Sequence, residues 1–265
     1  MARALSPGVL GGTAAGTRAS VVGCEIDRLD LEKTVRRSEQ LIVHGAPTQH
    51  VSINVAKLMA LRSDARLREI VAKCELVSAD GQGIVWASRL LGDPLPERVA
   101  GIDLMHRMLD LAEERGYRVY ILGATRDVLE QAVARLSDAH PRLILAGYRD
   151  GYFADAEVEE VCEGIREARP QILFVAMTSP RKEYFLGEHG VALGVPFQMG
   201  VGGAIDVVAG MTQRAPHRWQ RLGLEWLFRL LQEPRRLAPR YARTNATFAV
   251  LLARELYRRR LSSRR

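Results

Sequence analysis

Long apolar runs and paired cysteines are missing from this sequence of 265 residues. No stretch of eighteen apolar residues occurs, so no segment is expected to cross a membrane as a helix. The three cysteines, Cys24, Cys74 and Cys162, are odd in number and widely spaced. This spacing fits neither a disulfide framework nor a zinc site, and it favours a reducing cytosol.

The residue patterns of several enzyme classes are also absent. The six histidines show no H-x-x-H or H-E-x-x-H spacing, so no protein-ligated metal is expected. The sequence contains no G-x-S-x-G elbow, no P-loop and no G-x-G-x-x-G fingerprint. These absences disfavour nucleophilic hydrolysis and weaken the case for a nicotinamide-dinucleotide enzyme.

An ordinary globular composition is combined with an uneven charge. Hydrophobic residues make up 47% and charged residues 26% of the chain, which is typical of a soluble domain. Residues 212–265 contain fourteen arginines and three glutamates, which leaves −4 of the net charge of +7 for the rest. This basic segment predicts an anionic partner, such as a nucleotide phosphate, a lipid pyrophosphate, a membrane surface or nucleic acid. A solvated arginine-rich face is the alternative.

Strand and helix patterns alternate along residues 50–208 and are separated by glycines. This alternation predicts an α/β fold with a mainly parallel, Rossmann-like sheet flanked by helices on both faces. The expected strands are 50–54, 75–78, 118–123, 143–148, 171–177 and 196–201. The expected helices are 55–72, 84–91, 103–115, 127–139 and 156–168, and a short strand and a helix are expected within 21–45.

We expect three segments in the chain. Residues 1–20 are small and glycine-rich without a continuous apolar stretch, which predicts a disordered leader rather than a secretory signal. Residues 21–210 form the α/β domain, and residues 211–265 form an arginine-rich helical appendage. An apolar stripe on the last helix either packs on the domain or lies on an anionic bilayer surface. The stripe consists of Tyr241, Phe248, Leu251, Leu252 and Leu256.

Polar residues follow the predicted strands at their carboxyl ends, where parallel α/β sheets bind ligands. Among them, Asp80 lies in a turn between a strand and a helix, next to Gly81 and Gly83. These glycines allow a ligand or a backbone to approach closely. The simplest alternative is that Asp80 only caps the helix. The other polar residues at strand ends are Ser52, Asn54, Thr125, Lys182, Glu183 and Asp206.

Two further glycine turns are candidate binding sites. Gly123, with Thr125 after it, places backbone N–H groups at a helix N-terminus, which suits a phosphate. Gly202 and Gly203 precede Asp206, and this turn could admit a nucleoside whose hydroxyls donate to Asp206. It could equally be a tight structural turn.

The chain resembles the WecG/TagA/CpsF family of bacterial glycosyltransferases over roughly residues 21–240. The matching segments are VSIN at 51–54, ADGQG at 79–83, ERVAGIDL at 97–104, ILG at 121–123, DGYF at 150–153, SPRKE at 179–183, GVGGAID at 200–206, AG at 209–210, RAP at 214–216, LEWLFRL at 224–230 and EPRR at 233–236.

The resemblance implies an inverting, metal-independent transfer of an N-acetylmannosamine, uronic-acid or hexose unit. The donor would be a UDP-sugar, without any further cofactor, and the acceptor a polyprenyl-diphosphate-linked saccharide in polysaccharide or teichoic acid synthesis. The enzyme would be cytoplasmic and peripheral on the inner face of the cell membrane, held there by its basic C-terminus. A homo-oligomer is possible, and nucleic acid is not an expected partner.

The resemblance also assigns roles to residues. Asp80 would be the general base that takes the acceptor proton, and Arg98 would stabilise the leaving UDP. Arg229 and Arg236 would close over the nucleotide. Substrate-binding roles are expected for Ser52, Asn54, Gly81, Gly123, Thr125, Lys182, Glu183, Gly202, Gly203 and Asp206.

One departure from the family concerns Lys182, because the family usually has glutamine before the glutamate that is Glu183 here. A cation at this position suggests a substrate sugar that carries a carboxylate. The alternative is a neutral replacement whose side chain reaches solvent. Two other functions remain open from the residues alone, a Rossmann-like nucleotide-binding oxidoreductase and a non-enzymatic protein that binds nucleic acid through its basic tail.

Overall fold

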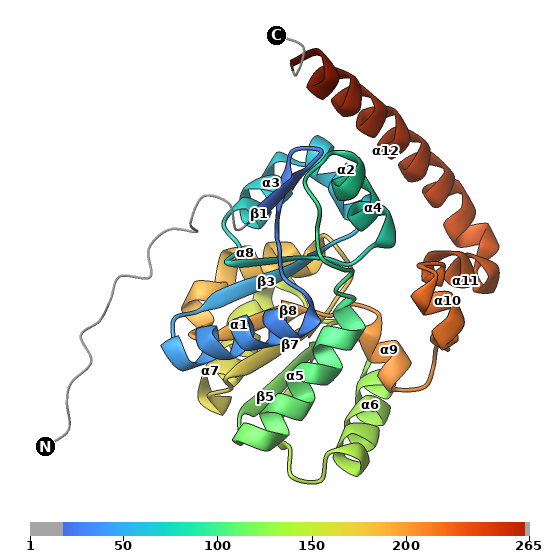
Figure 1. Ribbon diagram of the computed structural model, residues 1–265. Coiled ribbons are helices and arrows are strands. Elements are labelled where there is room, and N and C mark those ends of the chain that lie inside the picture. The colour runs from blue at the N-terminus through green and yellow to red at the C-terminus, as the bar shows by residue number, and fades with distance from the viewer. Residues whose placement is uncertain (1–17, 263–265) are drawn as a thin grey trace, which may run out of the picture.

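The computed structural model describes residues 18–262 and is built around a six-stranded, fully parallel sheet (Figure 1). The predicted α/β fold with a parallel sheet is therefore confirmed. In spatial order the strands are β4 (Leu76–Ala79), β3 (Thr48–Ile53), β8 (Phe197–Gly200), β7 (Ile172–Ala176), β5 (Arg118–Gly123) and β6 (Ile144–Arg149).

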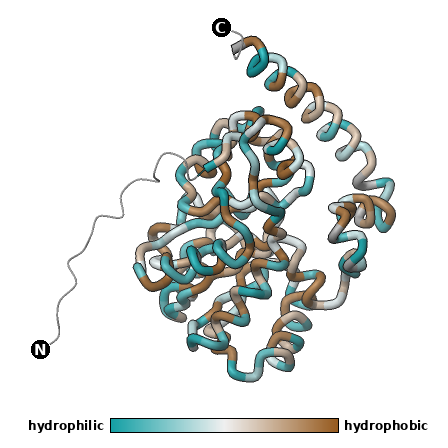
Figure 2. Tube along the Cα trace, viewed as in Figure 1, coloured by the Kyte–Doolittle hydropathy of each residue, from teal (hydrophilic) through white to brown (hydrophobic). Residues whose placement is uncertain are grey.

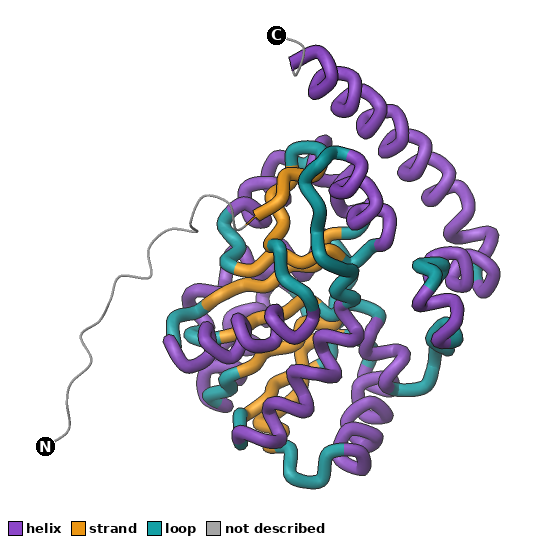
Figure 3. Tube along the Cα trace, viewed as in Figure 1, coloured by secondary structure: helices purple, strands orange, loops and turns teal. Residues whose placement is uncertain are grey.

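Helices cover both faces of the sheet, as Figure 3 shows by the helices on either side of the strands. One face is covered by α1 (Leu31–His44), α5 (Gly101–Arg115), α6 (Arg126–Ala139) and α9 (Ala204–Val208). The other face is covered by α2 (Val55–Ser63), α3 (Ala65–Ala72), α7 (Val158–Ala168) and α8 (Arg181–Leu193). A single 3₁₀ turn, η1 (Asp155–Glu157), precedes α7.

Alternation along the central strands produces these two layers. In β5, Val119 and Ile121 pack under α5 and α6, whereas Tyr120 and Leu122 pack under α7 and α8. Side chains of a strand point to opposite faces in turn, and a parallel sheet buried on both sides needs apolar residues on each face. The run of apolar residues at 118–123 therefore reflects a central strand.

A small hairpin begins the described part of the chain. The strands β1 (Arg18–Val21) and β2 (Cys24–Asp27) pair antiparallel beside α4 (Gln82–Leu90) at the β4 edge of the sheet. Residues 1–17, which hold most of the predicted leader, lie outside the described residues. Because β1 starts at Arg18, the predicted boundary at residue 20 falls inside a strand. The sequence predicted one short strand here instead of two.

Two predicted helices begin or divide differently in the structure. Residues 55–72 form α2 and α3 instead of one helix, because the Asp64 carboxylate accepts a hydrogen bond from the Leu67 N–H at 2.9 Å and starts a new helix. The helix predicted from residue 156 begins at Val158, after η1. Apolar spacing continues through both places, so periodicity alone does not reveal them.

The C-terminal appendage is helical, as predicted. It consists of α10 (His217–Arg221), α11 (Glu225–Gln232) and the long α12 (Pro234–Ser262), which runs past α2 and α4 (Figure 1). Polar and apolar residues are mixed along α12 (Figure 2). Phe248 is buried, and Leu251, Leu252 and Leu256 pack against the same apolar cluster of the domain. Four of the five stripe residues therefore pack on the domain, whereas the ring of Tyr241 lies against Trp226 of α11.

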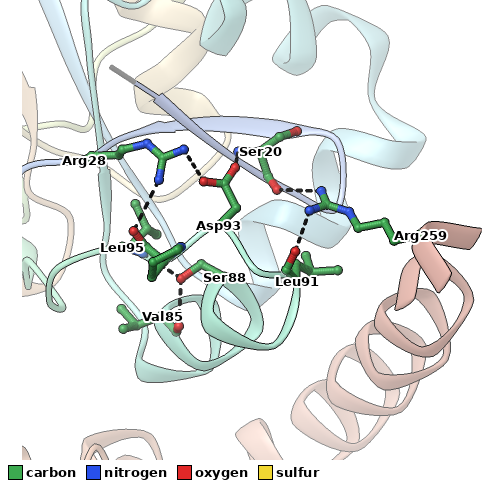
Figure 4. A network of polar contacts seen from close by, with 9 residues as sticks. Ser20, Arg28, Val85, Ser88, Leu91, Asp93, Leu95 and Arg259 are labelled. Carbon is green, nitrogen blue, oxygen red and sulfur yellow. Dashed lines mark hydrogen bonds and ion pairs between the residues drawn. The ribbon is translucent and has the colours of Figure 1, made fainter. Parts of the chain in front are cut away.

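Arg259 provides a polar anchor near the end of α12. Its guanidinium donates to the carbonyl oxygens of Leu91, at 2.7 Å, and of Ser20, at 3.4 Å (Figure 4). The same neighbourhood contains Asp93, which accepts from the Ser20 N–H and pairs with Arg28. The end of α12 is thus tied to both the hairpin and the loop after α4. No helix within residues 18–262 has the length and apolar character needed to cross a membrane.

Candidate active site

The site lies where the order of the strands reverses. After β3 the chain moves outward to β4 at one edge of the sheet. On the other side of β3 lies β8, which the chain reaches from β7, its neighbour toward the opposite edge. The loops that follow β3 and β8 therefore separate, with α2 on one face of the sheet and α9 on the other. Ligands of open α/β sheets bind in the crevice at such a switch point, at the carboxyl ends of the strands.

Asp80 lies at this edge, directly after β4. Its N–H donates to the Ile53 carbonyl at 2.8 Å, which fixes the turn against the end of β3. The N-cap of α4 is Gly81 rather than Asp80, so the simplest alternative role for this acid does not describe how α4 begins. The start of α5 faces the carboxylate, because a Cβ placed on Gly101 would lie 3.9 Å from Asp80 Oδ2.

Arg98 is brought close to Asp80 by the backbone. The Val99 N–H, one residue after Arg98, donates at 2.9 Å to the carbonyl of Ala79, one residue before Asp80. The Arg98 side chain is 14% exposed, and its Nη1 donates to Glu225 Oε2 of α11 at 2.7 Å. The predicted acid and the predicted arginine thus lie at one place, together with the N-terminal end of α5.

A buried ion pair underlies the site. Lys57 on α2 donates to Glu183 Oε1 on α8 at 2.7 Å, and these side chains are 8% and 2% exposed. The Lys182 ammonium lies 3.9 Å from the same oxygen. Burial favours the neutral form of Glu183, but the two ammonium groups outweigh it and hold the pKa of Glu183 below its usual range.

Lys182 occupies a slot beside the glycine turn after β8. A Cβ on Gly200 would lie 2.8 Å from Lys182 Cδ, and a Cβ on Gly202 would lie 3.0 Å from its Nζ. Burial, together with the charge of Lys57, lowers the pKa of Lys182 to about 8, against the attraction of Glu183 and Asp80. The Lys182 side chain is 12% exposed, and its role toward a charged sugar stays a prediction.

Two other predicted residues have structural partners. The Asn54 side chain caps α2 by accepting from the Lys57 N–H at 2.9 Å. Ser52 is buried, and its hydroxyl accepts from Ser78, which bonds His50 Nε2 at 2.9 Å. Burial and the charge of Lys57 lower the pKa of His50 to about 3, so this chain of hydroxyls ends on a neutral imidazole. A Cβ on Gly101 would lie 3.5 Å from Ser52 Oγ, which places Ser52 next to Asp80.

Packing accounts for one of the predicted glycines, Gly123, but not for Gly81. At Gly81, a Cβ would lie 3.5 Å from the Asn54 backbone, an ordinary contact distance, so packing alone does not require glycine there. At Gly123, φ is +129° and a Cβ would lie 2.5 Å from the carbonyl carbon of Ala176, which only glycine tolerates. The Ala124 N–H donates to the Ala176 carbonyl at 2.9 Å.

The predicted residues after β5 lie away from Asp80. Between β4 and β5 stand β3, β8 and β7, so four strand spacings separate the two ends by about 19 Å. Thr125 is exposed and its side chain does not cap α6. A ligand would have to extend across the ends of three strands to contact both Thr125 and Asp80.

The remaining predicted residues lie on the C-terminal side of the site. Gly203 and Asp206 flank the start of α9, and the Asp206 carbonyl accepts from Met211 and Thr212 where the appendage begins. Arg229 is on α11 and Arg236 on α12. The side chains of these two arginines fall outside the described part of the structure.

Sequence reasoning missed residues whose partners are distant along the chain. Lys57 and Glu183 are 126 residues apart, and Arg98 and Glu225 are 127 residues apart. Lys57 had a detectable signal, because it stands in the first helical turn after a polar strand end. For Glu225 the sequence offered only its place in the LEWLFRL segment.

This arrangement can support a proton transfer beside a developing negative charge. Asp80 is a carboxylate at the carboxyl end of β4 that faces the start of α5, and the α5 N-terminus and the neighbouring Arg98 supply positive charge there. Within residues 18–262, no group of three His, Cys, Asp or Glu side chains is arranged to hold a metal ion. The expectation of a metal-independent reaction stays a prediction.

Comparisons with known proteins agree on one class of enzyme. A family model described as glycosyl transferase WecG/TagA/CpsF family matches residues 19–262. Two curated relatives, from Bacillus spizizenii and Bacillus subtilis, are both described as N-acetylglucosaminyldiphosphoundecaprenol N-acetyl-beta-D-mannosaminyltransferase. The first is 35% identical over 171 residues, which span 64% of this chain and 66% of the relative. The second is 32% identical over 198 residues, which span 73% and 77%.

Proposed function

The chain belongs to the WecG/TagA/CpsF family of glycosyl transferases, and we propose that it moves an N-acetylmannosaminyl unit from a UDP-sugar to a polyprenyl-diphosphate-linked N-acetylglucosamine. The acceptor and the transferred sugar follow from the activity by which the two Bacillus relatives are described. The UDP leaving group follows from the resemblance of the sequence motifs. A role in cell-surface polysaccharide or teichoic acid synthesis goes with this substrate pair.

In this mechanism the acceptor hydroxyl attacks the anomeric carbon while Asp80 takes its proton. The bond between the anomeric carbon and the β-phosphate oxygen breaks, UDP leaves with the electron pair, and the configuration is inverted. Arg98 and the N–H groups at the start of α5 stabilise the charge that develops on the diphosphate. The neutralised UDP needs no metal in this scheme.

The observation that carries the proposal is the backbone pairing between the loop that bears Arg98 and the turn that bears Asp80. The Val99–Ala79 hydrogen bond and the approach of Gly101 hold a base and a cation at one strand end. An inverting transfer without a metal needs both groups within reach of one anomeric carbon. A simple helix cap would need neither.

Membrane association is the second part of the proposal. Along α12, Val250, Arg254, Tyr257 and Leu261 are exposed and follow each other at spacings of three or four residues, so they share one outward stripe, and the exposed Arg258 adjoins Tyr257. Mixed basic and apolar stripes of this kind bind anionic bilayer surfaces. The inward stripe around Phe248 packs on the domain. Peripheral attachment to the cytoplasmic face would bring the site to its lipid-linked acceptor.

Lys182 could adapt the site to a charged sugar. Its ammonium is largely buried, lies 3.9 Å from Glu183 Oε1 and is attracted by the charge of Asp80, so a substrate carboxylate that reached it would gain an ionic contact. Turnover of a UDP-hexose and of the matching UDP-uronate would be compared for the wild type and Lys182→Gln. We expect the variant to lose preference for the uronate, and an unchanged ratio would remove this role.

The proposed function is tested with a donor screen. UDP-N-acetylmannosamine and related UDP-sugars would be offered with a short-chain polyprenyl-diphosphate N-acetylglucosamine, and products would be detected by mass spectrometry. We expect a disaccharide product, β-linked after inversion, with one UDP released per transfer. Absence of transfer from every UDP-sugar, by a folded protein, would contradict the proposal.

A further inference from the structure

Four charged side chains join the α/β domain to the appendage at the N-terminal end of α5. Arg98 Nη1 donates to Glu225 Oε2 at 2.7 Å, and Arg214 Nη2 lies 2.7 Å from Asp103 Oδ1. Arg214 Nε also donates to Glu225 Oε1 at 3.5 Å, which connects the two pairs. The order is therefore Asp103, Arg214, Glu225, Arg98, and we call these four residues the clasp.

The clasp crosses the boundary between the two regions twice. Arg98 and Asp103 belong to the domain, on either side of the first residue of α5, whereas Arg214 and Glu225 belong to the appendage. Each region supplies one cation and one anion, so each cross-boundary contact joins opposite charges. Arg98 and Glu225 are 14% and 13% exposed, so solvent screens them less than an ordinary surface pair.

The clasp shares its central residue with the candidate active site. Arg98 is followed by Val99, whose N–H donates to the carbonyl of Ala79, the last residue of β4 before Asp80. Gly101, the first residue of α5, lies close to the Asp80 carboxylate. A guanidinium has five N–H donors in a planar fork, and the bond to Glu225 uses one of them. A diphosphate could therefore bind another edge of Arg98 while Glu225 holds the first.

We propose that Glu225 is a positioning residue that fixes the guanidinium of Arg98 for the leaving diphosphate when the appendage is docked. This inference rests on the proposed function, because it gives Arg98 the leaving group as its ligand. Arginine has a long side chain whose rotamers must be restricted before the fork can meet a phosphate. Glu225 supplies that restriction from the appendage, and Arg214 with Asp103 holds Glu225 in place.

The test compares two ways of opening the clasp. Glu225→Ala removes the partner of Arg98, whereas Asp103→Ala breaks the other cross-boundary pair and keeps both the Glu225 carboxylate and its Arg214 partner. We expect Glu225→Ala to lower kcat about 10- to 100-fold with the acceptor KM within about threefold, because small misplacements of a catalytic group have effects of this size. We expect Asp103→Ala to lower kcat less than fivefold, and Glu225→Asp to recover part of the loss.

Glu255→Gln is the matched control, since it removes the same charge from the appendage at a residue paired with Arg259 within α12. Its kcat should equal that of the wild type. Circular dichroism and limited proteolysis of α11 and α12 report whether each variant remains folded and docked. Equal losses of kcat in Glu225→Ala and Asp103→Ala, or wild-type kcat in Glu225→Ala, would overturn the inference.

A separate readout keeps this inference apart from the proposed function. Calorimetric binding of UDP alone does not depend on which sugar or acceptor the enzyme uses. We expect Glu225→Ala to weaken UDP binding at least fivefold and Glu255→Gln to leave it unchanged. If the wild type transfers no sugar in the donor screen, the proposed function is contradicted. If Glu225→Ala binds UDP as tightly as the wild type, the role of Glu225 is contradicted.

Discussion

The α/β domain and the C-terminal appendage differ in how they are held together. Three apolar clusters of buried residues fill the domain on both faces of its sheet. Among the described side chains of residues 211–262, Ala215 and Phe248 are the buried hydrophobic ones. The appendage is therefore attached through one apolar stripe, the clasp and Arg259, whereas the domain has a core of its own.

The candidate catalytic residues and the residue that holds one of them come from different regions. Asp80 and Arg98 both stand on the domain, but the acid that holds Arg98 comes from the appendage. A region with few buried apolar contacts opens at lower free energy than a packed core. We therefore expect the appendage to detach and dock while the sheet stays folded, and we propose that docking completes the surroundings of Arg98. Such closing segments often control substrate entry and product release.

Removal of residues 211–265 should have the largest effect. The domain keeps its sheet and its three apolar clusters apart from Phe248, so we expect circular dichroism to report an intact α/β fold. Transfer should fall at least about 100-fold, since Arg98 loses its partner and the crevice stays open. Binding to anionic vesicles should fall with it. Wild-type turnover by the shortened chain would show that the domain is complete alone.

Lys57→Met tests how strongly a buried ion pair stabilises the α/β domain. The change leaves Glu183 buried without the ammonium that it contacts at 2.7 Å. Breaking a buried ion pair in this way costs about 3–5 kcal/mol of the free energy of unfolding. Denaturant titration would measure it, with Lys33→Met as the control, because Lys33 is 52% exposed in its pair with Asp30. A loss below about 1 kcal/mol would mean that the Lys57–Glu183 pair does not stabilise the domain.

Phe248→Ala tests how strongly α12 is docked on the domain, and its effect on free energy should be smaller than that of Lys57→Met. Phe248 is 8% exposed against the domain, and we expect its removal to weaken docking of α12 by about 2–3 kcal/mol with little change in unfolding of the sheet. Hydrogen exchange along α12 would measure the opening. Val250→Ala, on the exposed stripe, should change exchange by less than about 0.5 kcal/mol. Equal effects of the two changes would mean that α12 does not dock through Phe248.

Sequence patterns predicted the domain better than the contacts of the appendage. Each strand of the sheet carries an apolar run between glycines or polar residues, and the polar end of such a run marks the ligand edge in a parallel sheet. This reasoning selected Asp80 as a candidate residue, and the resemblance to the family, rather than sequence spacing, paired it with Arg98. The division at Asp64 was missed because its cap lies within unbroken apolar periodicity.

Charged partners could not be derived from the sequence. The clasp joins Arg98 to Glu225 across 127 residues, and any of the three glutamates of the appendage would have fitted the pattern equally well. The slot for Lys182 depends on Gly200 and Gly202 after another strand, so its burial is visible only once the sheet is assembled. Topology brings these residues together, and local propensity carries no information about such pairs.

The central claim is that Asp80 acts as the base of a sugar transfer, and Asp80→Asn tests it most directly. Transfer from UDP-N-acetylmannosamine to the lipid-linked acceptor analogue would be measured together with UDP binding by calorimetry. Asp138→Asn, an exposed change on α6, is the control. The account expects Asp80→Asn to lose about 100- to 10,000-fold in kcat with UDP affinity within about twofold of the wild type. Transfer by Asp80→Asn at the wild-type rate would contradict it.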